Sequence, residues 1–124
     1  GSEMARGLDI FALKPSEFLS ANEIAAAKLV KVTELNVQDQ RRFPWPAAFV
    51  VARAYLDQLV REDPLRRAWA SPIHAELTRA EKLAAQPRRT ALTTLANRLD
   101  KDAQNADARV GELARTVRRL ASSR

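Results

Sequence analysis

Apolar residues recur at steps of three and four along most of this 124-residue chain, and this spacing constrains the fold more than any other feature. An α-helix turns once every 3.6 residues, so such a series lies along one side of a helix and needs another apolar surface to cover it. Two of the clearest series are Phe49, Ala52, Leu56 and Leu59, and Leu92, Leu95 and Leu99. We therefore expect an all-α protein, built as an antiparallel up-and-down bundle of four or five amphipathic helices.

A capping box predicts the first helix. Ser20 stands three residues before Glu23, and in this motif the hydroxyl and the carboxylate each accept a hydrogen bond from an amide of the first turn. The helix is expected to run to about Val37, although β-branched residues weaken its second half. Residues 1–19 form an apolar leader that is expected to pack across the bundle. Residues 20–124 then form a single bundle domain.

Pro46 is expected to open the next helix, because proline is well tolerated at the first helical position. The face of this helix opposite its apolar stripe carries Arg53, Asp57 and Arg61 at steps of four. Charges at this spacing favour ion pairs along a solvated side.

Two further pairs combine a capping side chain with a proline. Asp63–Pro64 is expected to open a short turn over 64–70 and Ser71–Pro72 a helix, since the side-chain oxygen accepts from an early amide and the proline takes the first helical position. Pro87 is expected to end the second of these helices.

Residues 88–121 form either one long helix or two. The apolar series loses its period by one residue after Leu99 and then resumes. We favour two helices with a break within 102–107, where Asn105 and Asp107 are available as caps. A single helix over the whole stretch would be far longer than the usual three to four turns.

The first residues bear on where the protein acts. Gly1, Ser2 and Glu3 precede the only Met, Met4, and resemble a remnant left by cloning. No apolar stretch of the length of a secretion signal follows, so we expect a cytoplasmic protein, or a periplasmic or secreted one if a signal peptide has been removed. The frequent Ala, Arg and Leu are typical of GC-rich bacterial coding sequence, which suggests a bacterial protein.

Residues suited to catalysis or metal binding are scarce. The chain has no Cys and one His, His74, which excludes thiolate chemistry and leaves no second His for a zinc site. Residues 100–111 begin like a calcium loop but place Asn105 and Gly111 where that loop requires Gly and Glu. Three glycines cannot supply a phosphate-binding loop. We therefore expect a non-enzymatic protein with no cofactor, no metal and no small-molecule substrate.

The net charge of +6 lies in the second half of the chain. Residues 1–62 hold eight basic and eight acidic residues, whereas residues 63–124 hold thirteen and seven. A basic half favours an acidic partner, although basic residues at the end of the last helix also complement its dipole without one. Membrane binding is not expected, because the last apolar stripe has no aromatic residue. The candidate partner-binding arginines are Arg88, Arg89, Arg98, Arg115, Arg118 and Arg119.

Residues 78–99 suggest nucleic acid as the alternative partner. They predict two helices joined at Gln86–Pro87, and residues 90–99 are similar to the recognition helices of winged helix-turn-helix repressors, with Leu on one face and Thr and Arg on the other. The resemblance implies that this helix would enter a major groove while Arg88 and Arg89 contact phosphates.

Phe43 and Trp45 stand among prolines in a segment that cannot be the interior of a helix. Rings at such junctions either hold two helices together or anchor a partner. We include both among the candidate partner contacts. The sequence thus favours a protein-interaction or scaffold domain that binds a protein or a second copy of itself, with nucleic-acid binding as the alternative.

Overall fold

The computed structural model describes residues 2–3, 7–8, 11–33, 38, 43–103 and 108–123. Over these ranges the protein is built from helices, which confirms the all-α fold, and its only strands are a two-residue antiparallel pair near the N-terminus. The elements are β1 (Ser2–Glu3), β2 (Gly7–Leu8), α1 (Ala21–Ala27), α2 (Phe49–Glu62), the 3₁₀ turn η1 (Pro64–Arg66), α3 (Arg67–Glu81), α4 (Ala85–Ala103) and α5 (Ala108–Ser122).

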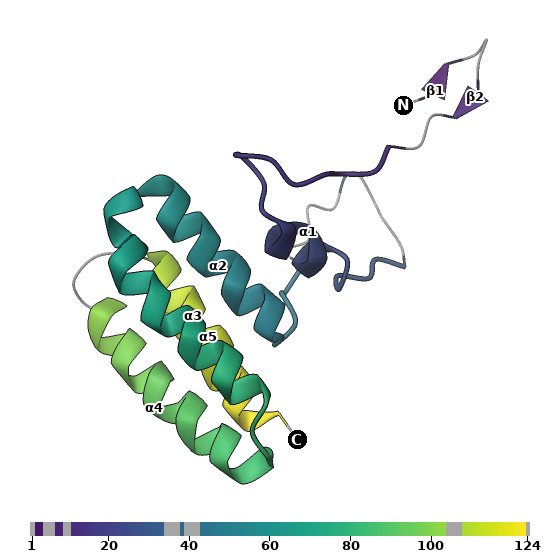
Figure 1. The fold of residues 1–124 in the computed structure, drawn as a ribbon. Helices are drawn as coiled ribbons and strands as arrows, with labels where there is room; N and C mark the ends of the chain where they lie inside the picture. Colours follow the sequence, from purple (N-terminus) through teal and green to yellow (C-terminus); the bar gives the residue numbers. More distant parts are fainter. Residues whose placement is uncertain are drawn as a thin grey trace.

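Helices α2 to α5 form the body of the molecule as an antiparallel bundle (Figure 1). Each packs against the helix before and after it, and α5 closes the ring against α2. The predicted apolar stripes meet in one core, where Leu56, Leu77, Leu92 and Leu113 are at most 1% exposed. Among the described helices, α1 stands outside this ring and packs against α2 alone.

Helix α1 begins where the capping box places it but is shorter than expected. Ser20 Oγ accepts from the Glu23 amide and the Glu23 carboxylate accepts from the Ser20 amide, so the box is complete. The helix ends at Ala27 rather than near Val37. Residues 34–37 of the expected helix lie outside the described part of the chain. Beyond Ala27 the apolar residues Leu29 and Val32 are each 44% exposed, so no helix of the described part covers them fully. A helix gains little stability where it buries no apolar face, and the β-branched residues that follow Ala27 have a low helix propensity. The helix therefore ends at Ala27.

Helix α2 begins at Phe49, and the prediction that Pro46 opens it is wrong. A helix starting at Pro46 would use the carbonyl of Trp45 for its first intrahelical bond. That carbonyl instead accepts a hydrogen bond from Arg119 Nη1 of α5, at 3.0 Å. Ala48, which is extended, precedes the first turn, and no side chain caps it.

One of the two proline pairs opens a helix and the other does not. Asp63 accepts from the Leu65 amide and opens η1 at Pro64, as predicted. Pro72, by contrast, lies inside α3, which runs unbroken from Arg67. A proline in a helix interior costs about 3 kcal/mol because one hydrogen bond is lost and its ring crowds the preceding turn. Burial of the α3 residues on either side of Pro72 in the bundle core offsets this cost.

Helices α3 and α4 meet at residues 82–84, earlier than expected. Pro87 lies in the first turn of α4 instead of ending α3, a position where its missing amide hydrogen leaves no bond unmade. Further on, α4 ends at Ala103 and α5 begins at Ala108, which confirms two helices with a break within 102–107. The proposed caps Asn105 and Asp107 lie outside the described residues.

Residues 11–19, the part of the leader next to α1 that the structure describes, do not pack across the bundle. The amide of Ser16 donates to the carbonyl of Leu19 at 2.9 Å and the reverse bond measures 3.3 Å, which closes a tight turn. On the N-terminal side of this turn, residues 11–15 run away from the bundle (Figure 1). Phe11, Leu13 and Phe18 are therefore 79%, 70% and 75% exposed.

Candidate functional site

The candidate arginines of the second half do not form one open patch, because most of them hold the bundle together. Arg88 donates from Nε and Nη2 to the carbonyl of Leu83, at 3.2 and 2.8 Å, and so holds the connection between α3 and α4 against the start of α4. Arg119 donates to the backbone before α2. Both residues therefore have a structural partner within the chain.

Three more of these arginines form ion pairs on the outside of the bundle. The pairs are Arg98 with Glu76 at 2.9 Å, Arg115 with Glu112 at 2.7 Å, and Arg118 with Asp100. Arg89 is the one member of the set without a recorded bond in the described part of the chain, and it lies beside Arg118 in a shallow depression at the start of α4. Paired charges attract an external polyanion less than free ones do.

The arrangement of α3 and α4 does not support the helix-turn-helix comparison. The two helices lie side by side and antiparallel in the bundle (Figure 1), whereas helix-turn-helix pairs cross at about 90–120°. The hydroxyls of Thr90 and Thr94 donate to carbonyls four residues earlier in their own helix.

Among the described residues, exposed large apolar side chains lie almost entirely within residues 11–45. Leu65 is the only one recorded beyond residue 45 in the described ranges. The other seven, which we call the N-terminal apolar surface, are Phe11, Leu13, Phe18, Leu29, Val32, Phe43 and Trp45. Sequence reasoning found the last two and missed the rest. The sequence places Phe11, Leu13 and Phe18 in a cluster of apolar residues without helical spacing, which predicts a buried leader. It places Leu29 and Val32 in the expected second half of the first helix.

Phe43 and Trp45 are each 42% exposed. The exposed part belongs to the N-terminal apolar surface. The buried part of Trp45 closes a small cavity of about 110 Å³ against Val51, Ala54 and Tyr55 of α2. Trp45 thus packs the segment before α2 against that helix and presents part of its ring to solvent.

Helix α1 is held on α2 by a small apolar cluster of Ala26, Val51 and Ala54 and by polar contacts around Glu23, which is 9% exposed. Arg61 donates to both carboxylate oxygens at 2.7 Å, Gln58 donates at 3.0 Å, and the Ser20 amide donates at 2.7 Å. Asn22 adds a bond to Asp57 at 2.9 Å. Of the three residues expected to pair along a solvated face of α2, Asp57 and Arg61 therefore bond to α1, and Arg53 pairs with Glu81 of α3.

These donors determine the ionisation of Glu23. The bonds from the Arg61 guanidinium, aided by those from the Ser20 amide and Gln58, lower its pKa from 4.5 to about 2, and burial opposes this shift. Such a carboxylate stays ionised and has its oxygens occupied by donors. We therefore regard this cluster, which we call the Glu23 clamp, as a structural joint between α1 and α2.

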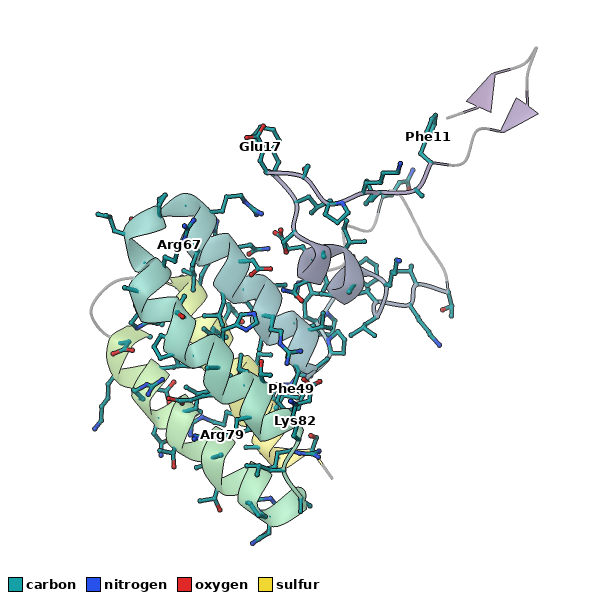
Figure 2. The ribbon with its side chains drawn as sticks, in the orientation of Figure 1. Phe11, Glu17, Phe49, Arg67, Arg79 and Lys82 are labelled. Atoms are coloured by element: carbon teal, nitrogen blue, oxygen red, sulfur yellow. The ribbon has the colours of Figure 1, made fainter. Side chains whose placement is uncertain are left out.

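A groove lies beside the clamp, between the leader, α2 and α3. Its volume is about 720 Å³, within the range of ligand-binding pockets. Its apolar wall is formed by Leu56, Val60, Pro64, Ala70 and Ala75, and its polar rim by Ser16, Glu17, Asp57, Arg67, Ser71 and His74. Figure 2 shows Glu17 on the leader and Arg67 at the start of α3, on the two sides of this α2–α3 groove.

The groove has little chemistry of its own. Within the described residues, the side chain of His74 has no recorded hydrogen bond to a carboxylate or hydroxyl that would make it a base or a nucleophile's partner. The same residues contain no group of three His, Cys, Asp or Glu that could hold a metal ion. None of the described helices is both long and apolar enough to cross a bilayer.

Comparison with known proteins matches this chain to no protein family, no characterised sequence and no solved structure. The argument for function therefore rests on the residues and their arrangement.

Proposed function

We propose that this protein is a non-enzymatic protein-binding module in which the four-helix bundle serves as a scaffold for the N-terminal apolar surface. The observation that carries the proposal is the uneven exposure of apolar side chains. The bundle core is complete without residues 11–45, because the buried stripes of α2 to α5 cover one another. Folding of the bundle therefore does not explain seven exposed large apolar residues in one short stretch.

The energy available at this surface is enough for specific binding. Burying a Leu or Phe side chain contributes about 1.5–3 kcal/mol, and aromatic anchors dominate the energetics of protein interfaces. Phe11 and Phe18, exposed by 79% and 75%, are suited to be such anchors. A scattered single residue such as Leu65 is normal on a protein surface, whereas seven exposed large apolar side chains within residues 11–45 are a concentration that the core does not explain.

The proposal includes no catalytic step. The most strongly perturbed carboxylate, Glu23, has its oxygens taken by donors of α1 and α2. The groove presents His74 and Ser71 without a recorded hydrogen bond between their side chains in the described part of the chain. These observations support a binding role over an enzymatic one.

Site-specific photo-crosslinking tests the proposal. A photoreactive phenylalanine analogue is placed at Phe18, at Trp45 or, as the matched control, at the exposed Leu65 of η1, and the protein is irradiated in extract of its native host. We expect discrete protein adducts at Phe18 or Trp45 that are absent at Leu65. Equal labelling at all three positions, or no protein adduct at any, would refute the proposal.

A further inference from the structure

We propose that one end of the helical bundle binds the phosphodiester backbone of a nucleic-acid duplex without reading its sequence. At this end α3 and α5 end and α2 and α4 begin (Figure 1). It is a second surface, separate from the N-terminal apolar surface, so this binding goes beyond the proposed function. Five cationic residues gather there, and we call them the basic end: Arg79, Lys82, Arg88, Arg89 and Arg119.

The two ends of the bundle differ in charge. Residues 49–53, 79–89 and 119–122, at the end where α4 begins, include six basic residues and one acidic residue. Residues 61–67, 100–103 and 108–112, at the opposite end, include five of each. Figure 2 shows Arg79 and Lys82 of the α3 end close to Phe49 at the start of α2. The antiparallel arrangement of the helices thus brings positive charge from several segments to one place.

Most of this charge is not compensated within the described part of the chain. Glu81, the one acidic residue in these ranges, is already paired with Arg53 of α2. Arg79, Lys82 and Arg89 are exposed, and their side chains have no recorded ion pair or hydrogen bond among the described residues. Free cations of this kind attract a polyanion more strongly than paired ones do.

Arg88 and Arg119 are bonded to the backbone but keep their charge. The guanidinium of Arg88 donates to the carbonyl of Leu83 and that of Arg119 to the carbonyl of Trp45. A carbonyl is neutral, and a guanidinium has five N–H donors, so these bonds leave both side chains cationic and with donors to spare. Both residues therefore add to the positive potential of the basic end.

Helix dipoles explain only part of this arrangement. Arg79 and Arg119 lie in the last turns of α3 and α5, where positive charge complements the dipole. Arg88 and Arg89, by contrast, lie near the start of α4, where the dipole is itself positive and favours anions. Their placement is unfavourable in the free protein, and a bound anion would relieve it. Departures from a local rule of this kind are expected at functional sites.

The basic end lacks the apolar anchors of a protein interface. No large apolar side chain is recorded as exposed in residues 49–53, 79–89 or 119–122. Protein interfaces depend on buried aromatic and apolar anchors, whereas phosphate backbones are bound by charge and by hydrogen bonds from Arg, Lys and hydroxyl groups. Four of the five cations are guanidiniums, which present paired donors to phosphate. These ranges also expose no aromatic ring for stacking on single-stranded bases, which favours a duplex.

The shape of this end suits backbone contacts. A helix with its side chains is about 10–12 Å across, so the adjoining ends of α3 and α4 span about 20 Å and can reach phosphates on both sides of a groove about 6–12 Å wide. Beside Arg89, a depression of about 320 Å³ lined by Thr93 and Arg118 can receive one phosphate. The surface consists of helix ends and the α3–α4 connection, and no side of a helix projects to reach the base edges. Binding is therefore independent of sequence.

Fluorescence anisotropy with labelled duplexes of about 20 base pairs tests the proposal. At about 50 mM salt we expect micromolar affinity, and the logarithm of the association constant should fall with the logarithm of salt concentration with a slope of about −3 to −4.5, as for three to five phosphate contacts. Two DNA duplexes of unrelated sequence should bind within about twofold of each other. An RNA duplex of the same length shows which nucleic acid supplies the backbone, since the natural one should bind more tightly.

A pair of matched double variants locates the contact. Lys82→Gln with Arg89→Gln removes two exposed charges of the basic end and should weaken duplex binding about a hundredfold at about 50 mM salt, with a slope smaller by about 2. The control, Arg67→Gln with Lys101→Gln, removes one Arg and one Lys that are equally exposed at the opposite end. It should change the affinity less than about threefold, because salt screens distant charges. Circular dichroism verifies that both proteins keep their helices.

Three results would overturn the proposal. The first is no binding of either duplex at about 50 mM salt with protein up to about 100 μM. The second is an equal loss of affinity in the two double variants, which would assign the attraction to net charge rather than to the basic end. The third is competition by poly-glutamate of matched charge as strong as that by the duplex, which would assign the surface to an acidic protein. Phe18→Ser should leave duplex binding unchanged, so failure at one surface is observed separately from failure at the other.

Discussion

Replacing Glu23 with Gln should release helix α1 from α2 while leaving the four-helix bundle folded. The lowering of the Glu23 pKa from 4.5 to about 2 corresponds to about 3 kcal/mol of preference for the charged form in the docked state. Apolar packing also contributes to docking, because Ala26 of α1 forms a small buried cluster with Val51 and Ala54 of α2. The part of this preference for the charged form that comes from Arg61 and Gln58 of α2 is lost when α1 undocks, so removing the charge of Glu23 weakens docking.

Hydrogen exchange with peptide resolution measures this effect. In Glu23→Gln the amides of residues 24–28 should exchange up to about a hundredfold faster, because each 1.4 kcal/mol changes an equilibrium tenfold. Peptides of α4 and α5 should be unchanged, since α1 has no contact with either helix in the described part of the chain. The control Glu17→Gln removes an equal charge from an exposed position of the leader and should leave every peptide unchanged.

Two results would refute this reasoning. Protection of residues 24–28 that stays within a few-fold of the unmodified protein would show that the Glu23 clamp contributes little to docking. A loss of protection spread equally over α2 to α5 would show that α1 is part of the same cooperative unit as the bundle rather than an element docked on its surface.

Three further predictions follow from the structure. As pH falls from about 5 to 2, α1 should undock before the bundle unfolds, because the folded-state pKa of Glu23 lies below its ordinary value; fluorescence of a dye on α1 would show this transition, and Glu23→Gln should lack it. Arg88→Ala leaves the carbonyl of Leu83 without its donor and should cost about 1–2 kcal/mol in urea unfolding, whereas Arg89→Ala should cost less than about 0.5 kcal/mol. Leu113→Ala creates a cavity in the core and should cost about 2–5 kcal/mol by the same measurement, while Leu65→Ala, at a side chain 90% exposed, should be nearly neutral.

Only part of the site could be predicted from the sequence. Phe43 and Trp45 were identified because prolines remove them from any helix, and their exposure agrees with a contact role. The arginines were chosen from composition, and composition does not show that Glu76, Asp100 or Glu112 lies within reach of them. Arg61 and Glu23 stand 38 residues apart, so no local pattern could reveal that they form one joint.

The sequence by itself determined the elements whose causes are local. The spacing of apolar residues placed the stripes of α2 to α5, the capping box placed the start of α1, and the loss of period after Leu99 located the break before α5. Tertiary structure decided where packing outweighed local preference. The core keeps Pro72 inside α3, and the lack of a covering helix ends α1 at Ala27. It also decided which apolar residues are exposed, because burial depends on the neighbours that the fold supplies and the spacing of residues along the chain does not specify them.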